Sequence, residues 1–265
     1  MRPNERHAAI LEIVYERKNA SVEYLAERFR ASHETIRRDL SRLAADGRLR
    51  KYHGGATLSE APAEGAFNAR IHEFAREKRA VARRAAALFS AGDSLFIDTG
   101  TTTLALAQEL ARSSGLAIIT NSVSITQCLA RGPGSNRVFL IGGEYRAEAC
   151  ENLGPLAVAQ VAQFNAHDAV LTVGAIGANG LQDYALEEAE IARAMIAGAE
   201  RVTVIADASK LGRSALFPVC ALERVARLVV SAPPQGLLAE KLAAAGVQVL
   251  VADVAPAPRG ARAER

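Results

Sequence analysis

Apolar positions early in the chain recur at helical spacing. Two capped helices are predicted, one beginning after Ser21 and one after Ser32, with Arg30-Ala31-Ser32 as the turn between them. Their apolar positions repeat at intervals of three and four residues, which is the pattern of one buried helix face. These positions are Leu25, Ala26 and Phe29 in the first helix and Ile36, Leu40 and Leu43 in the second. The spacing is typical of a helix-turn-helix over Ser21 to Asp39.

Further elements are predicted on both sides of this pair. A first helix is expected over Asn4 to Lys18, followed by a short break at Asn19-Ala20. After the second helix, Gly47 ends the helical pattern, and LRKYH-GG-ATL is expected to form a small hairpin with glycine at its tip. Helices followed by such a hairpin predict a winged helix over residues 1–58.

From residue 77 onward the pattern changes to short apolar runs that alternate with amphipathic segments. Examples are SLFID, LAIIT, VFLIGG and RVTVIAD as strands, and LALAQEL and EEAEIARAMIAGA as helices. Continuous apolar strands between helices predict a mostly parallel sheet covered on both faces. The predicted fold class is α/β, with an N-terminal winged helix-turn-helix (1–58), a linker (59–75), an α/β sheet domain (76–252) and a disordered tail (253–265).

The charge distribution separates the two predicted domains. The net charge of the chain is +3, yet residues 1–60 hold 12 Lys/Arg and 9 Asp/Glu, and residues 61–265 hold 20 of each. Residues 28–53 alone carry 8 basic and 3 acidic side chains. A charge run of this kind is often only a solvated helix face. Here it coincides with a capped helix and a glycine-tipped hairpin, which favours a surface that contacts the phosphate backbone of nucleic acid.

The predicted DNA-contacting residues lie on the outer face of the second helix, at its entry and on the wing. The helix face points away from the apolar stripe and suits entry into a major groove. The candidate DNA-binding residues are Ser21, Ser32, His33, Glu34, Thr35, Arg37, Arg38, Ser41, Arg42, Arg50, Lys51 and His53.

Other site classes find little support in the sequence. Cys128, Cys150 and Cys220 are far apart and in no CxxC spacing, so neither a disulfide framework nor a metal site is predicted. The N-terminus lacks the apolar run of a signal peptide and no window is long and apolar enough to cross a membrane, so a cytoplasmic protein is expected, without a membrane partner. No cofactor is predicted.

Polar residues follow several predicted strands of the sheet domain. In open α/β sheets, ligands bind at the carboxyl ends of strands. Four loops there combine glycines, hydroxyls or charges, and the first two precede helix N-termini that suit a phosphate. Each loop alone could be an ordinary helix cap or turn. The loops are 98–103, 120–122, 174–180 and 207–210.

These motifs resemble one known family. YLAERF, S-x-x-TIRRDL, HGGA, then EKRAVARRAAALFSAGDSLFIDTGTTT, ITNS, LGPLA, GAIGANGL and ADASKLG are similar, in this order, to the DeoR family of bacterial transcriptional regulators. Arg30 departs from the glycine or asparagine common in the turn of that family, where a positive φ would cost about 1 kcal/mol. The family's effector domain is similar to ribose-5-phosphate isomerase and related sugar-phosphate enzymes.

The resemblance implies a DNA-binding regulator, expected to be a repressor, whose sheet domain senses a phosphorylated sugar or polyol. The implied ligand-binding residues are Asp98, Gly100, Thr101, Thr102, Thr103, Thr120, Asn121, Ser122, Gly174, Gly177, Asp183, Tyr184, Asp207 and Lys210. Double-stranded operator DNA and a second copy of the chain are the other expected partners, because one helix reads only a few base pairs.

The sequence leaves alternatives for the effector and for the function. LQDYALEEAE and DASKLGRSA are most similar to the glycerol-3-phosphate repressor branch of the family, so glycerol 3-phosphate is the expected effector, with other phosphorylated sugars or polyols as alternatives. The alternative function is an isomerase- or deaminase-type enzyme that carries a nucleic-acid module. We expect no catalytic residues, since His167 is predicted at the edge of the sheet away from the loops.

Overall fold

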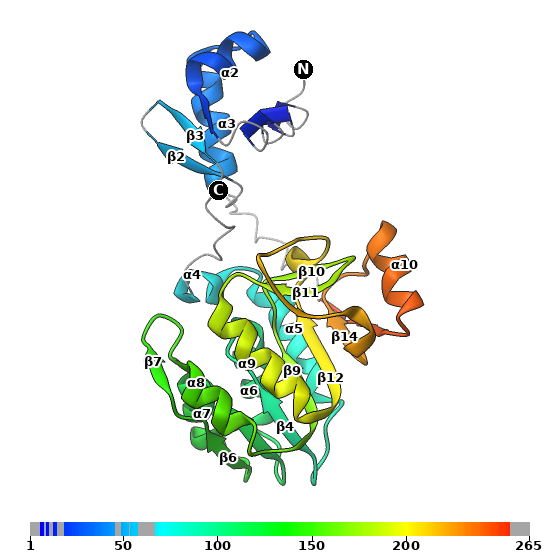
Figure 1. The fold of residues 1–265 in the computed structure, drawn as a ribbon. Helices are drawn as coiled ribbons and strands as arrows, with labels where there is room; N and C mark the ends of the chain where they lie inside the picture. Colours follow the sequence, from blue (N-terminus) through cyan, green and yellow to red (C-terminus); the bar gives the residue numbers. More distant parts are fainter. Residues whose placement is uncertain are drawn as a thin grey trace, which may run out of the picture. The chain divides into compact units, whose positions relative to one another are not determined.

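The computed structural model describes residues 6–7, 9–10, 13–14, 19–45, 49–52, 54–57 and 67–254. The chain divides into two compact units, Met1–Gly65 and Ala66–Arg265, and both are drawn in Figure 1. None of the helices in the described ranges is long and apolar enough to cross a membrane. The disordered tail expected over 253–265 lies outside the described residues from 255 onward.

The first unit contains the two predicted helices, α2 (Val22–Phe29) and α3 (His33–Ala45). Both begin at the predicted serine caps. Ser21 Oγ accepts a hydrogen bond from the Tyr24 backbone N–H at 3.1 Å, and Ser32 Oγ accepts one from the Thr35 N–H at 3.1 Å. Each cap satisfies a backbone donor that has no partner inside the helix.

The turn between these helices depends on a strained residue. Arg30 has φ 49° and ψ 46°, in the left-handed region, and its N–H donates to the Glu27 carbonyl at 3.2 Å. The positive φ expected at this position is therefore present, and arginine is less suited to it than glycine because its Cβ crowds the backbone. The turn keeps helix-turn-helix geometry despite this cost.

The wing is a three-stranded sheet, in the order β1-β3-β2. Strands β2 (Arg50–Tyr52) and β3 (Gly55–Thr57) form the predicted hairpin. The predicted break between helices at Asn19-Ala20 is present, and it takes the form of a strand, β1 (Asn19–Ser21), which pairs antiparallel with β3. Gly55 is required here: a Cβ on it would lie 2.5 Å from the Ala20 carbonyl oxygen. The predicted helix end at Gly47 lies outside the described residues.

The core of the first unit is formed by the predicted apolar face. Its fully or nearly buried side chains include Leu25, Ile36, Leu40 and Leu43, with Leu49 and Ala56 from the wing. The helix expected over 4–18 lies largely outside the described residues, but Ile10 and Val14, from its predicted stripe, are fully buried in this core.

The second unit is built on a seven-stranded sheet with the order β15-β14-β12-β9-β4-β5-β6. All neighbouring strands in it are parallel, as predicted. The strands are β4 (Ser94–Ile97), β5 (Ala117–Thr120), β6 (Arg137–Leu140), β9 (Ala166–Leu171), β12 (Ala199–Ala206), β14 (Arg227–Val230) and β15 (Gln248–Val251).

Helices cover both faces of this sheet (Figure 1). One face packs on α5 (Ala75–Ala86), α6 (Thr101–Leu110) and α7 (Val123–Arg131), and the other on α8 (Pro155–Val161), α9 (Leu186–Ala197) and α10 (Gly236–Ala244). Alternate strand residues serve the two cores: Leu95 and Ile97 face the first, and Phe96 faces the second. Successive residues of a strand point to opposite faces of the sheet. Because helices cover both faces here, both sets of residues are buried and apolar.

Several elements were not predicted from the sequence. Helix α4 (Phe67–His72) lies within the segment expected to be a linker, and the buried Phe67 explains why this part is ordered. A hairpin of β7 (Glu144–Arg146) and β8 (Glu151–Leu153) follows β6. A second sheet combines β10 (Ala175–Gly177), β11 (Gly180–Asp183) and β13 (Phe217–Cys220), with the short helices η1 (Ala208–Lys210) and η2 (Leu222–Arg224) flanking β13.

Candidate DNA-binding surface and ligand site

The outer face of α3 is exposed and basic. Arg37, Arg38 and Arg42 are solvent-exposed, as are His33, Glu34 and Ser41. Arg38 Nε donates to Glu34 Oε1 at 3.2 Å, an exposed pair one helical turn apart. Such a pair contributes little to stability, so both side chains are available to a partner.

The wing is attached to this face by a short polar chain. Lys51 Nζ donates to Ser41 Oγ at 2.7 Å, and Ser41 Oγ donates to the Arg37 carbonyl at 2.7 Å. Ser41 therefore places the ammonium of the wing beside the arginines of the helix. Of the predicted wing residues, His53 and the Arg50 side chain lie outside the described residues.

The inner face of α3 is anchored by Asp39. Its carboxylate accepts hydrogen bonds from Arg6 Nε at 2.6 Å and from His7 Nε2 at 2.8 Å. Burial would raise the pKa of Asp39, but the bonds from Arg6 and His7 outweigh burial and hold it below its usual range. The N-terminal segment thus fixes α3 through a charged contact that the sequence pattern did not indicate.

In the second unit, the chain changes direction between β4 and β9. These strands are neighbours, but α6 after β4 and α9 after β9 pack on opposite faces of the sheet. A crevice between two such strands is where ligands bind in open α/β sheets. Asp98, the first residue after β4, bridges it by accepting hydrogen bonds from the Thr172 N–H at 3.0 and 2.9 Å.

Asp98 is surrounded by other acids. Burial raises the pKa of Asp98 well above its usual range, and the nearby carboxylates of Asp183, Glu188 and Glu151 raise it further, while the Thr172 hydrogen bond opposes them. The predicted residues Asp98 and Asp183 thus share one acidic cluster with Glu188 and Glu151, and nothing in the sequence indicated Glu151.

The threonine loop 100–103 opens helix α6 beside this crevice. A Cβ on Gly100 would lie 2.1 Å from Thr172 Oγ1, so only glycine allows the two loops to approach. The Thr103 hydroxyl donates to the Gly100 carbonyl at 3.1 Å. The backbone N–H groups of Thr101 and Thr102 belong to the first helical turn, where donors have no partner within the helix and suit an anion.

The second predicted loop is mostly engaged in local structure. Ser122 Oγ caps α7 by accepting from the Ile125 N–H at 3.3 Å, and Thr120 Oγ1 accepts from the Ser122 N–H at 3.1 Å. Asn121 Nδ2 donates to the Asn152 carbonyl at 3.2 Å and to Glu151 Oε2 at 3.4 Å. The helix-cap alternative therefore describes Ser122, while Asn121 faces the acidic cluster.

The third loop is shaped by packing. A Cβ on Gly174 would lie 2.6 Å from Tyr184 Cδ2, so the Tyr184 ring lies against this glycine. Asp183 Oδ1 accepts from the Tyr184 N–H at 2.7 Å. Gly177 ends β10, where a Cβ would lie 2.9 Å from the Arg213 carbonyl oxygen. The Tyr184 ring lies too close to Gly174, and the Arg213 carbonyl too close to Gly177, for either position to carry a side chain.

The fourth loop carries the cationic part of the site. Asp207 Oδ1 caps η1 through the Ser209 N–H at 2.9 Å. Lys78 of α5 is only 5% exposed, and its Nζ donates to the Arg70 carbonyl at 2.5 Å. Burial lowers the pKa of Lys78, opposed by the charge of Asp207 and reinforced by those of Lys210 and Arg70. The charges of Lys78, Lys210 and Arg70 are therefore close enough to act on one another, and the charge of Arg70 also lowers the pKa of Glu151.

Lys78 was missed, although the sequence held a signal for it. It lies three, four and seven residues before Val81, Ala82 and Ala85, which are buried on the same face of α5. A lysine inside an apolar stripe is rarely buried without a reason. Glu151 had no such signal, because its position depends on the unpredicted β7–β8 hairpin.

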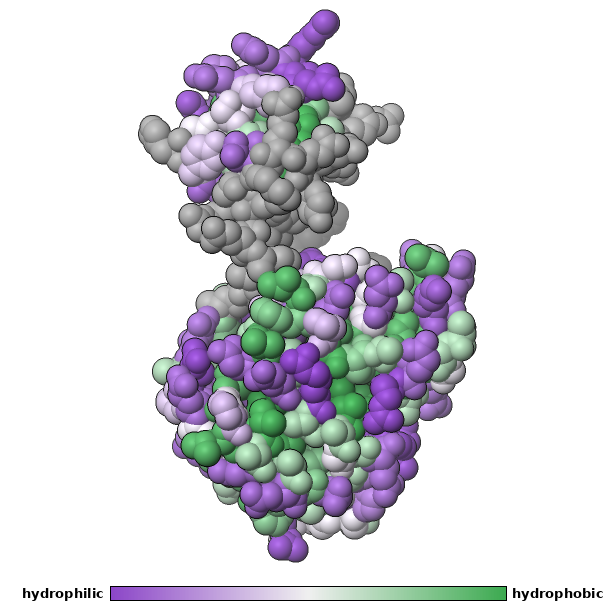
Figure 2. All heavy atoms as spheres, viewed as in Figure 1, coloured by the Kyte–Doolittle hydropathy of each residue, from purple (hydrophilic) through white to green (hydrophobic). Residues whose placement is uncertain are grey.

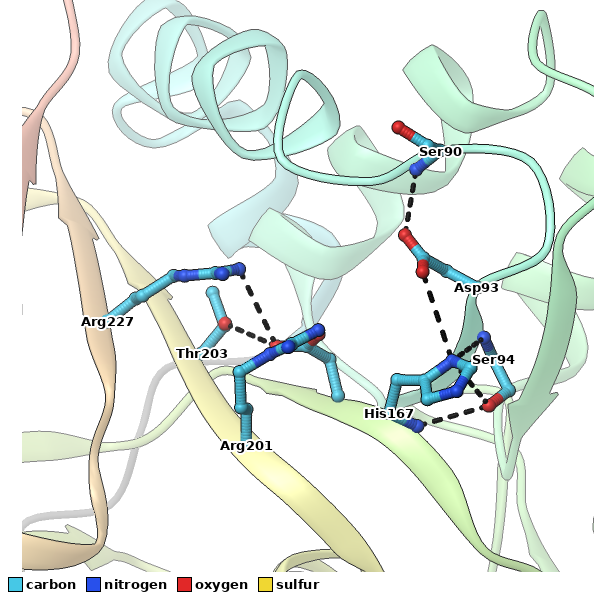
Figure 3. A network of polar contacts seen from close by, with 8 residues as sticks. Ser90, Asp93, Ser94, His167, Arg201, Thr203 and Arg227 are labelled. Carbon is cyan, nitrogen blue, oxygen red and sulfur yellow. Dashed lines mark hydrogen bonds and ion pairs between the residues drawn. The ribbon is translucent and has the colours of Figure 1, made fainter.

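The opposite edge of the sheet holds a separate polar network (Figure 3). The His167 N–H donates to Ser94 Oγ at 3.1 Å, and His167 Nδ1 accepts from the Ser94 N–H at 3.1 Å. Asp168, fully buried, is held by Arg201 at 2.7 Å and by the Thr203 hydroxyl at 3.0 Å. A hollow of about 370 Å³ adjoins His167 at this amino-terminal edge. These contacts join strands to each other and lie away from the carboxyl-edge loops.

An exposed basic helix-turn-helix and an α/β unit with a polar carboxyl edge define a transcriptional regulator of the ligand-sensing class. Residues 6–61 match the family described as "DeoR-like helix-turn-helix domain" and residues 73–232 match "DeoR C terminal sensor domain". The chain belongs to the DeoR family of transcriptional regulators. We refer below to its two units as the DNA-binding unit (Met1–Gly65) and the sensor unit (Ala66–Arg265).

Curated relatives are similar over nearly the whole chain. The glycerol-3-phosphate regulon repressor of Escherichia coli is 32% identical over 88% of this chain and 93% of that protein. The transcriptional repressor AccR of Agrobacterium fabrum is 35% identical over 85% and 88%, respectively. Among solved structures, ribose 5-phosphate isomerase A of Methanocaldococcus jannaschii overlaps 52% of this chain and 55% of its own at 14% identity, with a TM-score of 0.38. That overlap is too partial to bear on function.

The environment of Glu151 makes a stability prediction. Burial raises its pKa to about 7, against hydrogen bonding from Thr99 and Asn121. Between pH 4.5 and 7 the unfolded chain loses this proton while the folded chain keeps it, so the stability of the sensor unit falls as pH rises and levels off above pH 7. Glu151→Gln removes the cost and should stabilise the sensor unit by up to about 3 kcal/mol at pH 8, but by only about 1 kcal/mol at pH 5.

Urea unfolding of the full chain at the two pH values measures this effect. The control is Glu148→Gln, an exposed carboxylate in the same hairpin. An equal stability change for Glu151→Gln at both pH values would contradict a raised pKa.

Proposed function

We propose that the DNA-binding unit reads an operator through the outer face of α3 and the wing. The observation that carries this proposal is the Lys51–Ser41–Arg37 chain, which joins the cations of the wing and the helix into one exposed surface. Arg37, Arg38 and Arg42 are the base- and phosphate-reading residues, with His33, Glu34 and Thr35 at the entry to the groove.

We propose further that the sensor unit binds a phosphorylated sugar or polyol at its carboxyl edge. The phosphate lies at the N-terminus of α6, next to Lys210 and Lys78, because backbone donors and ammonium groups both stabilise a dianion. The names of the relatives in Escherichia coli and Haemophilus influenzae support glycerol 3-phosphate as the effector. Other relatives carry names without this ligand, so related esters are included in the tests.

The effector is proposed to release the operator. A ligand can shift DNA affinity only by its different affinity for two states of the protein, so operator binding must weaken effector binding by the same factor. The protein acts as a repressor in this scheme.

The alternative, catalysis, has one observation in its favour. The raised pKa values of Glu151 and Asp98 would suit proton transfer. Asp98, however, accepts hydrogen bonds from the Thr172 N–H, so it joins the loops after β4 and β9. This contact favours a structural role for Asp98. We propose a binding site without turnover.

We propose that the chain works as a homo-oligomer assembled through the sensor unit. Symmetric half-sites give helix-turn-helix proteins their affinity. The sensor unit exposes apolar side chains at Tyr145, Leu156 and Leu186. Figure 2 shows separate green areas among polar ones on the visible face of this unit.

Substitutions on the DNA-binding surface should separate base from phosphate contacts. Arg38→Ala should cost about 1–3 kcal/mol of operator affinity and relax sequence preference, whereas Lys51→Ala should weaken all DNA binding and reduce the salt slope by about one. Fluorescence anisotropy over a salt series measures both, with Arg83→Ala on α5 as the control. Unchanged operator affinity of an Arg37→Ala/Arg38→Ala double variant would refute the surface.

Oligomerisation has a direct test. Sedimentation equilibrium of the full chain should give a dimer or tetramer at the concentrations that bind operator. Residues 1–60 alone should bind operator more weakly, because they lack the proposed contact. A monomeric full chain with undiminished affinity would exclude this proposal.

Effector binding should depend on the cationic part of the site. Lys210→Ala or Thr102→Val should leave operator affinity intact and weaken glycerol 3-phosphate binding at least tenfold, since a charge-assisted hydrogen bond contributes about 1.5–3 kcal/mol. Calorimetry measures binding, Lys241→Ala on α10 is the control, and ³¹P NMR should show the ester unchanged. Operator release by fructose 1-phosphate or ribose 5-phosphate, with no heat from glycerol 3-phosphate, would show that glycerol 3-phosphate is the wrong effector. The proposed release of the operator by a phosphate ester would still hold.

A further inference from the structure

The acidic cluster contains buried polar atoms without partners. Within the described residues, three buried side-chain atoms lack a hydrogen bond: Thr99 Oγ1, Asn121 Oδ1 and Arg227 Nη1. The first two follow the adjacent strands β4 and β5. An unpaired buried polar atom destabilises a folded protein, so its presence in a candidate ligand site has functional meaning.

Both atoms adjoin the same carboxyl group. The amide of Asn121, only 1% exposed, donates through Nδ2 to Glu151 Oε2 and to the Asn152 carbonyl, which fixes the orientation of the amide and leaves Oδ1 as the unpaired atom. Thr99 lies beside Glu151 and lowers the pKa of that carboxyl through its hydroxyl, so Asn121 Oδ1 is the atom of the two that keeps free accepting capacity. Glu151 is itself 3% exposed. It is held in place by the backbone bond from Asn152 N–H to the Asn121 carbonyl at 2.9 Å.

The chemistry of these atoms selects the group they can bind. Asn121 Oδ1 only accepts hydrogen bonds, a carboxylate only accepts, and a threonine hydroxyl can do both. A phosphate oxygen also accepts, so a phosphate here would face acceptors and negative charge. A hydroxyl group donates to such acceptors. This cluster therefore suits alcohols better than phosphate.

We propose that Glu151 and Asn121 form a specificity subsite that binds the hydroxyl groups of the effector. Glu151 accepts from one ligand hydroxyl, and Asn121 Oδ1 accepts from a second. The ligand class is a phosphate monoester that bears adjacent hydroxyl groups. This inference rests on the proposed function, because it needs a phosphate ester in the site.

Paired ligands test the subsite. Glycerol 3-phosphate and propyl phosphate share a phosphate and a three-carbon chain, but propyl phosphate has no hydroxyl groups. The wild-type chain should bind glycerol 3-phosphate at least tenfold more tightly, because loss of a hydroxyl leaves a buried polar group unpaired. Ribose 5-phosphate, tested in the same way, extends the comparison to a longer polyhydroxylated ester.

Glu151→Gln should reduce this preference about tenfold. Asn121 Nδ2 would hold the new amide oxygen, so the amide nitrogen would face the ligand and could not accept from it. Loss of the negative charge strengthens binding of both esters alike, so the ratio of their dissociation constants isolates the hydroxyl contact. Glu151→Ala provides a second variant, and Glu148→Gln should leave the ratio unchanged.

The outcomes distinguish the two proposals. If no ester binds the wild-type chain, the proposed phosphate-ester site is wrong and the subsite falls with it. If the esters bind but the preference for hydroxyl-bearing ligands is absent, or survives in both Glu151 variants, the subsite alone is wrong. A reduced ratio in both variants, with propyl phosphate still bound, supports it.

Discussion

The parallel sheet is the constraint on which the sensor unit depends. Because every neighbouring pair in the seven-stranded sheet is parallel, loops far apart in sequence end on one edge. The helices that follow β4 and β9 pack on opposite faces of the sheet, and the hydrogen bonds from Thr172 to Asp98 join the loops after these two strands. Gly100 permits this contact by leaving no Cβ to meet Thr172. The loops that the sequence marked as polar converge for this reason.

Local structure could be predicted from the sequence more fully than the set of residues that come together at the carboxyl edge. Ser21 and Ser32 were identified as caps and the strands as continuously buried, because caps and periodicity are local properties. Strand order was not predictable, since parallel pairing depends on contacts distant in sequence. Lys78 could have been found from its place in a buried stripe. Glu151 could not, because the β7–β8 hairpin that delivers it has no periodic signal.

In the DNA-binding unit, buried contacts rather than exposed ion pairs hold α3 in place. The exposed Glu34–Arg38 pair is weak. The position of α3 depends instead on its buried apolar face and on Asp39, whose two hydrogen-bonded partners offset the cost of burying it. The arginine side chains of the outer face are therefore not needed to hold the helix. The structural contact of Arg37 is made by its backbone carbonyl, which accepts the hydrogen bond from Ser41.

In the sensor unit, a buried carboxylate is paired at one edge of the sheet, and buried polar groups are incompletely paired at the other. Asp168 is fully compensated by Arg201 and Thr203, at the edge away from the site. Asn121 keeps unmet hydrogen-bonding capacity at the carboxyl edge, beside the buried Glu151, and the fold bears that cost. A ligand that satisfies these groups recovers it only in the conformation that gathers them.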